Sequence, residues 1–161
     1  MGLETLTDQR IKELLSIPKR VENPLARERT EGKHLRRDFR LTSVDGDHSF
    51  SVFTRQSTKI AEGFSAGLIW HSKTGEDVTL LRCNGSDHVH PNAIERTRIE
   101  HQCHLHIATE RYIAANRKVE GYAELDQSYR TLPGALHHLT KLGNIKGLQT
   151  QPDESDLFEQ L

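Results

Sequence analysis

Apolar and polar residues alternate in four short segments between residues 35 and 83, and this pattern constrains the fold more than any other feature. The segments cover residues 35–41, 49–55, 64–70 and 78–83. Each has the two-residue period of a half-buried β-strand, and short polar turns such as Asp45-Gly46 separate them. No connection among them is long enough for a helix that crosses between parallel strands, so the sequence predicts an antiparallel meander.

Residues 102–107 alternate in the same way and predict a fifth strand. Helical patterns cover residues 5–16, 111–116 and 132–142, and Gly143 ends the last of them. We therefore expect an α+β fold, with a mainly antiparallel sheet of about five strands and short helices at the N- and C-terminal ends. The length of 161 residues suits one domain, placed at residues 1–148, followed by an acidic and flexible tail at residues 149–161.

The overall charge excludes a generic DNA-coating protein, because 22 Lys and Arg residues are balanced by 23 Asp and Glu residues. No apolar run approaches the roughly 18 residues that span a bilayer, and the first residues lack the apolar core of a signal peptide. We therefore expect a cytoplasmic protein with no membrane partner. Its two cysteines, Cys83 and Cys103, are expected to be reduced thiols.

The charges are nevertheless distributed unevenly along the chain. Residues 19–40 contain eight basic and four acidic residues and are expected to form a basic, partly irregular arm. This arm is either a solvated linker or a surface that binds the phosphates of RNA or another nucleic acid. The nucleic-acid-binding candidates are Arg36, Arg37, Arg40 and Arg55. The tail at residues 149–161 is a candidate docking segment for a protein partner.

Histidine is the most unusual component, because five of the 10 histidines lie between residues 88 and 106. Strand alternation places His104 and His106 on one face, about 7 Å apart, with Leu105 turned toward the core. A second His-x-His pair, His88 and His90, lies in a loop of about 18 residues that follows the fourth strand. If the strands on either side of this loop are neighbours, the two pairs meet at one end of the sheet.

The leading hypothesis for this cluster is metal-independent cleavage of RNA, in which histidines act as general acid and base. His104 and His106 would be the catalytic pair, with His88 or His90 as partner. Arg111 would neutralise the charge of the transition state, and Tyr112 would orient or stack on the substrate. Arg82 is a reserve cation if its strand pairs with the one that carries His104.

Other interpretations stay open. His88, His90, His104 and His106 have the residue type and grouping of a zinc or iron site, and His88-x-His90-x4-Glu95 is similar to the first cupin motif, although no second cupin motif follows. Such a cluster would make the protein a metal enzyme, whereas the leading hypothesis needs no cofactor. Alternatively, the histidines are ordinary surface residues, and the protein is a non-catalytic, antitoxin-like binding module.

Several strings in the sequence are distinctive: KRVENPLAR, DGDHSFSVFTRQST, FSAGL, LRCNGSDHVHPN, HLHIATERYIA and YRTLPGALHHL. Together they resemble a bacterial family of domains of unknown function, over roughly residues 17 to 145. This resemblance implies no activity. A strand that ends in an Asn-Gly turn before His-x-His is loosely similar to small TumE-type toxins, which implies a toxin-like or defence-associated protein.

Overall fold

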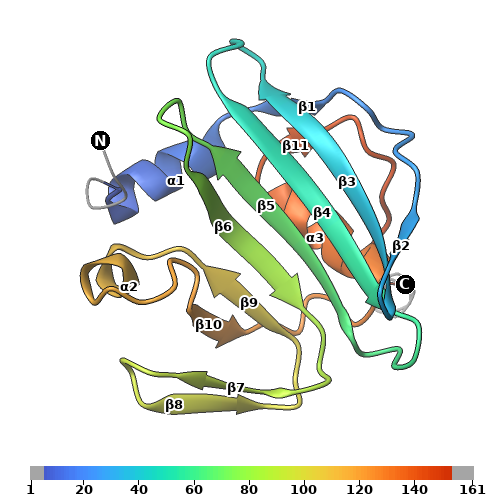
Figure 1. The fold of residues 1–161 in the computed structure, drawn as a ribbon, viewed down its shortest axis with the longest axis vertical. Helices are drawn as coiled ribbons and strands as arrows, with labels where there is room; N and C mark the ends of the chain where they lie inside the picture. Colours follow the sequence, from blue (N-terminus) through green and yellow to red (C-terminus); the bar gives the residue numbers. More distant parts are fainter. Residues whose placement is uncertain (1–5, 154–161) are drawn as a thin grey trace, which may run out of the picture.

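The computed structural model describes residues 6–153 of the chain (Figure 1). In chain order its elements are α1 (Asp8–Ser16), β1 (Lys19–Val21), β2 (Arg29–Glu31), β3 (His34–Ser43), β4 (Ser49–Ser57), β5 (Phe64–His71), β6 (Asp77–Asn84), β7 (Val89–Asn92), β8 (Thr97–Glu100), β9 (His104–Ile107), α2 (Glu110–Ala114), β10 (Tyr122–Leu125), α3 (Leu132–Leu142) and β11 (Ile145–Lys146). None of these helices is long and apolar enough to cross a membrane.

The main sheet has nine strands in the order β10-β9-β6-β5-β4-β3-β1-β11, with β2 paired to β3 beside this path. All neighbouring strands are antiparallel except β1 and β11, so the expected α+β class with a mainly antiparallel sheet is confirmed. The expected number of about five strands was too low. The five expected strands are β3, β4, β5, β6 and β9, whereas β1, β2, β10 and β11 have two to four residues each, too few for alternation to reveal.

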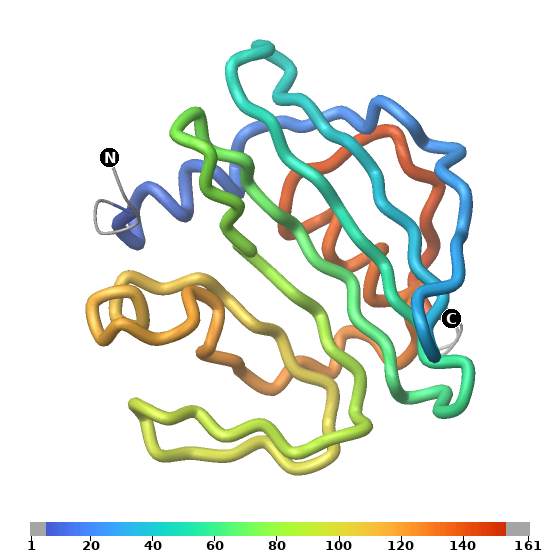
Figure 2. Tube along the Cα trace, viewed as in Figure 1, coloured from blue at the N-terminus to red at the C-terminus, as the bar shows by residue number. Residues whose placement is uncertain are grey.

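The segment expected to be a loop of about 18 residues contains a β-hairpin instead. β7 and β8 pair antiparallel and form a separate two-stranded sheet. The hairpin escaped prediction because only Asn92 and Ile99 of its eight strand residues are buried, so its sequence shows no regular apolar face. In the tube view, the yellow-green hairpin lies beside the orange β9 and β10 region (Figure 2).

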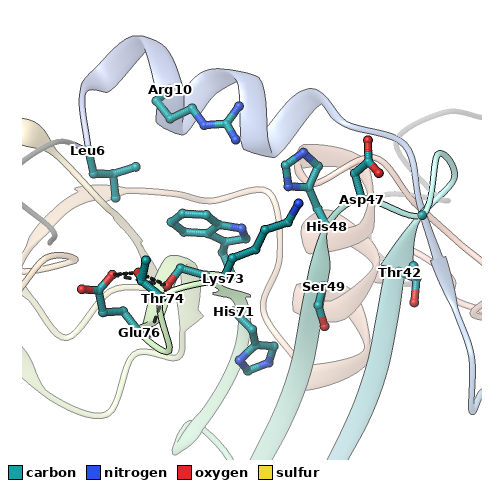
Figure 3. Close-up of a pocket in the computed structure, with 13 residues that line it drawn as sticks. Leu6, Arg10, Thr42, Asp47, His48, Ser49, His71, Lys73, Thr74 and Glu76 are labelled. Atoms are coloured by element: carbon teal, nitrogen blue, oxygen red, sulfur yellow. Dashed lines mark hydrogen bonds between the residues drawn. The ribbon is translucent and has the colours of Figure 1, made fainter. Parts of the chain in front are cut away.

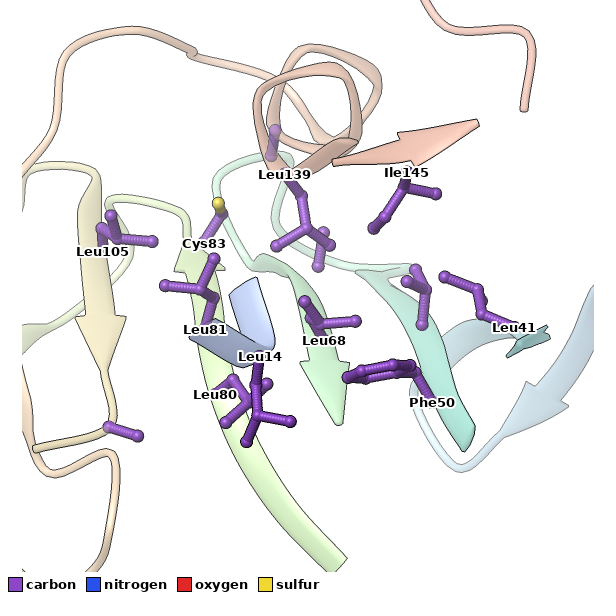
Figure 4. Packing of buried hydrophobic residues seen from close by; sticks show 14 of the residues in the cluster. Leu14, Leu41, Phe50, Leu68, Leu80, Leu81, Cys83, Leu105, Leu139 and Ile145 are labelled. Carbon is purple, nitrogen blue, oxygen red and sulfur yellow. The ribbon is translucent and has the colours of Figure 1, made fainter. Parts of the chain in front are cut away.

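The hydrophobic core lies between the main sheet and the helices α1 and α3. α3 packs behind β4, β5 and β6 (Figure 1). Phe50 and Leu68 from the sheet meet Leu139 of α3 and Leu14 of α1 in this core (Figure 4). Cys83 also points into this core, and both cysteines are free thiols.

A β-bulge in β6 changes which residues face away from α3. Leu68 of β5 pairs with Leu81, whereas the next residue, Ile69, pairs with Thr79, so Leu80 is an extra residue. Leu80 and Leu81 are consequently both buried. We call the side of the sheet turned away from α3 the outer face, and the bulge brings residues from both ends of β6 onto it.

The basic stretch of residues 19–40 contains β1, β2 and the first part of β3, and residues 22–28 between them are irregular. The first residues of the expected tail contact the region around α3. Nδ1 of His137 and the Thr150 hydroxyl form a hydrogen bond (2.9 Å), and the Asp153 carboxylate accepts from the Arg130 N–H and the Thr131 hydroxyl. The remainder of the tail, residues 154–161, lies outside the described residues.

Candidate metal centre

The two His-x-His pairs meet on the outer face of the sheet. The ring centroids of His90 and His106 are 4.5 Å apart, and those of His104 and His106 are 5.1 Å apart. The ring of His88 lies 4.9 Å from that of His104. The convergence on which both site hypotheses depend is therefore present in the structure.

The pairing of β9 with β6 and the side chain of one buried residue bring the two His-x-His pairs together. β9 pairs with β6 so that His104 lies opposite Asn84 and His106 lies opposite Arg82. The carboxamide of buried Asn92, at the end of β7, then joins the hairpin to β10. Its Nδ2 donates to the Ala123 carbonyl (2.7 Å), and its Oδ1 accepts from the Ala123 N–H (2.9 Å). These two bonds hold β7, and with it His90, against the outer face.

Backbone carbonyls orient three of the four imidazoles. Nδ1 of His104 donates to the carbonyl of Gln102 (2.9 Å), and Nδ1 of His106 donates to that of Glu120 (2.8 Å). Nε2 of His90 donates to the carbonyl of Gly121 (2.9 Å). Because a carbonyl oxygen can only accept, each of these nitrogens must carry the proton. In the neutral form of an imidazole held in this way, the opposite nitrogen has a free lone pair.

The ligand geometry is compact. His90, His104 and His106 each offer one ring nitrogen, and these three nitrogens lie within 4.8 Å of one another. Nε2 of His104 is buried and has no hydrogen-bond partner among the described residues. Buried nitrogens almost always have a partner, so an unpaired one in the middle of a histidine cluster points to a bound ion or water. A histidine ligand whose other nitrogen donates to a carbonyl is the usual arrangement at metal sites.

The electrostatics of the site keep two of the rings neutral. His104 and His106 are almost fully buried, with relative exposures of 0% and 3%. Burial lowers the pKa of His104 to about 4. Burial, together with the positive charge of Arg82, lowers the pKa of His106 to about 2. Both rings are therefore neutral at physiological pH, which is the state that binds metal ions.

His88 occupies the solvent side of the cluster. Its side chain is 44% exposed, and its Nδ1 lies 2.7 Å from the carboxylate oxygen of Asp87. It does not belong to the compact group of three nitrogens. His88 is thus exposed to water and lies outside the inner set of candidate ligands.

Arg82 and Asn84 add further polar groups beside the histidines. One guanidinium nitrogen of Arg82 donates to the Glu120 carboxylate (3.3 Å). Nε of Arg82 and Oδ1 of Asn84 are buried, and neither has a hydrogen-bond partner in the part of the chain that the structure describes. With Nε2 of His104, three buried polar atoms without hydrogen-bond partners among the described residues therefore belong to the paired strands β6 and β9. The expectation that Arg82 would lie beside the histidines of β9 is confirmed.

Arg111 and Tyr112 interact with Glu95 instead of the histidines. A guanidinium nitrogen of Arg111 is 2.5 Å from the Glu95 carboxylate, and the Tyr112 hydroxyl donates to the same group (2.6 Å). Glu95, the third position of the cupin-like pattern, is also absent from the ligand group. The structure therefore does not bring these three residues into the cluster.

The four candidate nucleic-acid-binding arginines lie on β3 and β4, three or four strand spacings from β9, or about 14–19 Å. Each has an acidic neighbour. The pairs are Arg36 with Asp38 (3.1 Å), Arg37 with Glu28 (3.8 Å), Arg40 with Glu22 (3.9 Å) and Arg55 with Glu31 (3.3 Å). The positive charge of the stretch is therefore largely compensated locally and is separate from the histidine cluster.

Sequence patterns gave no indication of the residues that orient the rings. Gln102, Glu120 and Gly121 act through backbone carbonyls, which every residue possesses. Gly121 alone has a distinguishing feature, because a Cβ at this position would lie 2.8 Å from the ring of Tyr112. Among these three residues, only the glycine at position 121 could have indicated from the sequence that the backbone closely approaches another group there, and a single glycine is a weak indication.

No family model matches this chain, and neither a curated protein nor a solved structure matches it. The resemblances to the bacterial domain family and to TumE-type toxins stay predictions. The function proposed below is therefore inferred from the residues of this chain alone.

Proposed function

We propose that this protein is a metal-dependent enzyme that binds one divalent ion through His90, His104 and His106. The observation that carries the proposal is the orientation of these rings: one N–H of each ring donates to a backbone carbonyl, and three ring nitrogens, one from each residue, lie within 4.8 Å of one another. Three histidines with a fourth position for water are typical of catalytic zinc. Non-haem iron oxygenases use two histidines and a carboxylate, and no carboxylate from residues 6–153 belongs to this group, so zinc is the favoured ion.

The same geometry makes metal-independent RNA cleavage the weaker explanation. That reaction requires one histidine to be protonated as the general acid near neutral pH. Burial instead holds the pKa of His104 at about 4 and, with the charge of Arg82, the pKa of His106 at about 2. Neutral, buried rings suit metal ligation and do not suit proton donation to a large substrate.

The surrounding charges favour an anionic substrate. A zinc ion with three protein ligands lowers the pKa of its bound water to about 7 and so supplies a nucleophile for hydrolysis. Arg82 lies opposite His106 and provides a cation with one unpaired nitrogen. His88, oriented by Asp87, is positioned to accept a proton. Hydrolysis of a phosphodiester, such as the RNA backbone predicted from the sequence, fits this arrangement.

Metal binding is tested by stripping the protein with a chelator and titrating it with Co²⁺ and then Zn²⁺. We expect one equivalent of Co²⁺, with the visible absorption of a tetrahedral site, and displacement by Zn²⁺. His104→Ala should lose this binding, whereas His48→Ala, a histidine on the β3–β4 connection, should retain it. Wild-type protein that binds no Co²⁺ or Zn²⁺ at micromolar concentrations would overturn the metal centre.

Hydrolysis is tested separately with bis(p-nitrophenyl) phosphate and with RNA. We expect turnover that depends on Zn²⁺, that disappears in His104→Ala, and that falls at least tenfold in Arg82→Gln while its metal affinity is unchanged. A protein that binds zinc tightly but cleaves neither substrate would have a structural centre, and the enzymatic part of the proposal would be wrong.

A further inference from the structure

A second cluster of polar side chains lies on the outer face at the opposite end of β6. Nδ1 of His71 is 2.7 Å from a carboxylate oxygen of Asp77, and Nε2 of His71 is 2.9 Å from the hydroxyl oxygen of Ser51. The three residues therefore form a continuous hydrogen-bonded chain of carboxylate, imidazole and hydroxyl.

Three neighbouring strands place these groups. His71 ends β5 and is the register partner of Asp77 at the start of β6. Ser51 lies on the other neighbour, β4, two residues beyond Ser49, which is the register partner of His71. β4, β5 and β6 form the middle of the sheet, against which α3 packs, so the strands provide a firm support for the cluster.

The hydrogen bonds fix the direction of proton transfer. A carboxylate can only accept, so Nδ1 of His71 carries a proton, and in the neutral ring Nε2 accepts from the Ser51 hydroxyl. This is the relationship that activates a serine for nucleophilic attack, and it is recognised by geometry rather than by sequence order. We propose that Ser51 is an activated nucleophile that accepts the acyl group of small carboxylic esters, at a site distinct from the metal centre.

The reaction balances with these residues alone. Oγ of Ser51 attacks the ester carbonyl carbon while its proton moves to Nε2 of His71. The carbon–oxygen bond to the alcohol then breaks, and the leaving alcohol takes the proton from Nε2. Water releases the acid from Ser51 by the same two proton transfers in reverse.

The negative charge that develops on the carbonyl oxygen needs a partner. The backbone N–H groups of the central strands are occupied by the sheet, so a side chain must serve. Arg40 on β3 is the register partner of Ser51, its side chain is 71% exposed, and its ion pair with Glu22 is long (3.9 Å). Arg40 is therefore free to move toward the oxygen, a role different from the expected contact with nucleic acid.

Small molecules reach this cluster from solvent on the outer face. The His71 side chain is 35% exposed and that of Asp77 is 70% exposed. His71 also borders a cleft of about 820 Å³ beside the N-terminal part of α1, but its ring points away from Arg10 and Lys73 (Figure 3), and Ser51 and Asp77 do not line that cleft. Ser51 is half-buried, so small esters reach its hydroxyl more easily than bulky ones do.

The test is covalent labelling with a fluorophosphonate probe, followed by intact-mass measurement and peptide mapping. We expect one adduct, with loss of fluoride, on Ser51. Ser51→Ala should abolish it, and His71→Gln should slow it at least tenfold. Asp77→Asn should slow it severalfold. Ser49→Ala is the matched control, because Ser49 lies on the same strand opposite His71, and it should label at the wild-type rate.

Three results would overturn this proposal: labelling of Ser51→Ala at the wild-type rate, a Ser51 adduct whose rate does not depend on His71, or absence of any adduct. Arg40→Gln should lower the turnover of p-nitrophenyl acetate severalfold, with unchanged circular dichroism. Chelator-treated protein should label as fast as untreated protein, so the outcome is independent of the metal centre.

Discussion

Histidines of the neighbouring strands β9 and β5 lie beside the two ends of β6 on the same face of the sheet, and their hydrogen-bond partners give them different chemistry. At one end, His104 and His106 donate to backbone carbonyls, which are neutral and leave the opposite nitrogen as a ligand. At the other end, Nδ1 of His71 donates to the carboxylate of Asp77, and the opposite nitrogen lies 2.9 Å from the Ser51 hydroxyl. The comparison shows that the partner of an imidazole, rather than its spacing in the sequence, determines what the ring can do.

Burial reinforces the difference between the two ends. His104 and His106 are covered by the β7–β8 hairpin and its neighbours, whereas the His71 side chain is 35% exposed. Nε2 of the buried His104 has no hydrogen-bond partner among the described residues, so the proposed metal ion would provide one. The half-exposed ring of His71 instead lies within hydrogen-bond distance of the Ser51 hydroxyl.

The largest expected effect is an increase in Tm on metal binding, which should depend on the histidine cluster of β9 and not on His71. A ligand that binds only the folded state at about 1,000 times its Kd stabilises that state by about 4 kcal/mol. For a domain of this size this corresponds to an increase in Tm of roughly 8–16 °C. Differential scanning calorimetry should show this increase when Zn²⁺ is added to wild-type protein and to His71→Gln. The increase should be absent in His106→Ala.

An equal Zn²⁺-dependent increase in His106→Ala would contradict the comparison, because the metal would then bind elsewhere. Chelator-treated proteins without added metal provide the control, since they report how far each substitution destabilises the fold by itself. His106 is buried, so some loss is expected in the metal-free variant.

The second prediction concerns a substitution that disturbs a backbone carbonyl bound to the histidine cluster and leaves the three candidate metal ligands unchanged. In Gly121→Ala, the new Cβ would lie 2.8 Å from the Tyr112 ring, and the segment must shift. The Gly121 carbonyl that accepts from His90 would move with it. Loss of such an orienting contact typically costs 10–100-fold in metal affinity. Competition with a chromophoric chelator measures the change.

Unchanged Zn²⁺ affinity in Gly121→Ala, with the protein folded by circular dichroism, would show that carbonyl orientation of His90 is unimportant. Ala115→Gly, at the end of α2, serves as a control for a change of similar size outside the cluster.

The third prediction concerns another carboxylate-bound histidine, His138 of α3. Its Nε2 lies 2.8 Å from Asp126. Burial raises the pKa of the Asp126 carboxyl, but hydrogen bonds from His138 and Ser128 outweigh this effect and hold the pKa at about 2. Below pH 4 the unfolded chain therefore takes up a proton before the folded chain does. The free energy of unfolding should fall between about pH 5 and pH 2.

Asp126→Asn should remove this part of the pH dependence, with a difference of about 1–2 kcal/mol between the two proteins at pH 5 that shrinks toward pH 2. Urea unfolding at a series of pH values measures it. Parallel curves for the two proteins would mean that the contact with His138 contributes no pH-dependent stability.

The fold was predictable where local patterns are long enough. β3, β4, β5 and β6 have eight to ten residues each, enough for a two-residue period to show over part of each strand, and α3 has a capping threonine, an early proline and a terminal glycine. β1 and β11 have three and two residues, and their parallel pairing joins positions more than 120 residues apart. Such strands form because a neighbour offers hydrogen bonds, and no local pattern encodes that.

The same limit applies to the sites. Alternation within β9 was sufficient to predict that His104 and His106 share a face, whereas the contact with His90 depends on a hairpin that the sequence does not reveal. The cluster of Ser51, His71 and Asp77 was missed entirely. Its geometry depends on the register of three strands and on the bulge at Leu80, which reverses the alternation within β6.

The smallest expected effect concerns the arginines of β3, which have neither the burial nor the unpaired atoms of the histidine cluster. Arg37 is 48% exposed, and its contact with Glu28 is long (3.8 Å). Exposed pairs of this kind contribute about 0–1 kcal/mol, so Arg37→Gln should change the free energy of unfolding by less than about 0.5 kcal/mol. It should also leave zinc affinity unchanged, because β3 is four strand spacings from β9. If RNA is a substrate and its cleavage slows more than tenfold in Arg37→Gln, β3 contributes to substrate binding despite its compensated charge, and the histidine end of the sheet does not act alone.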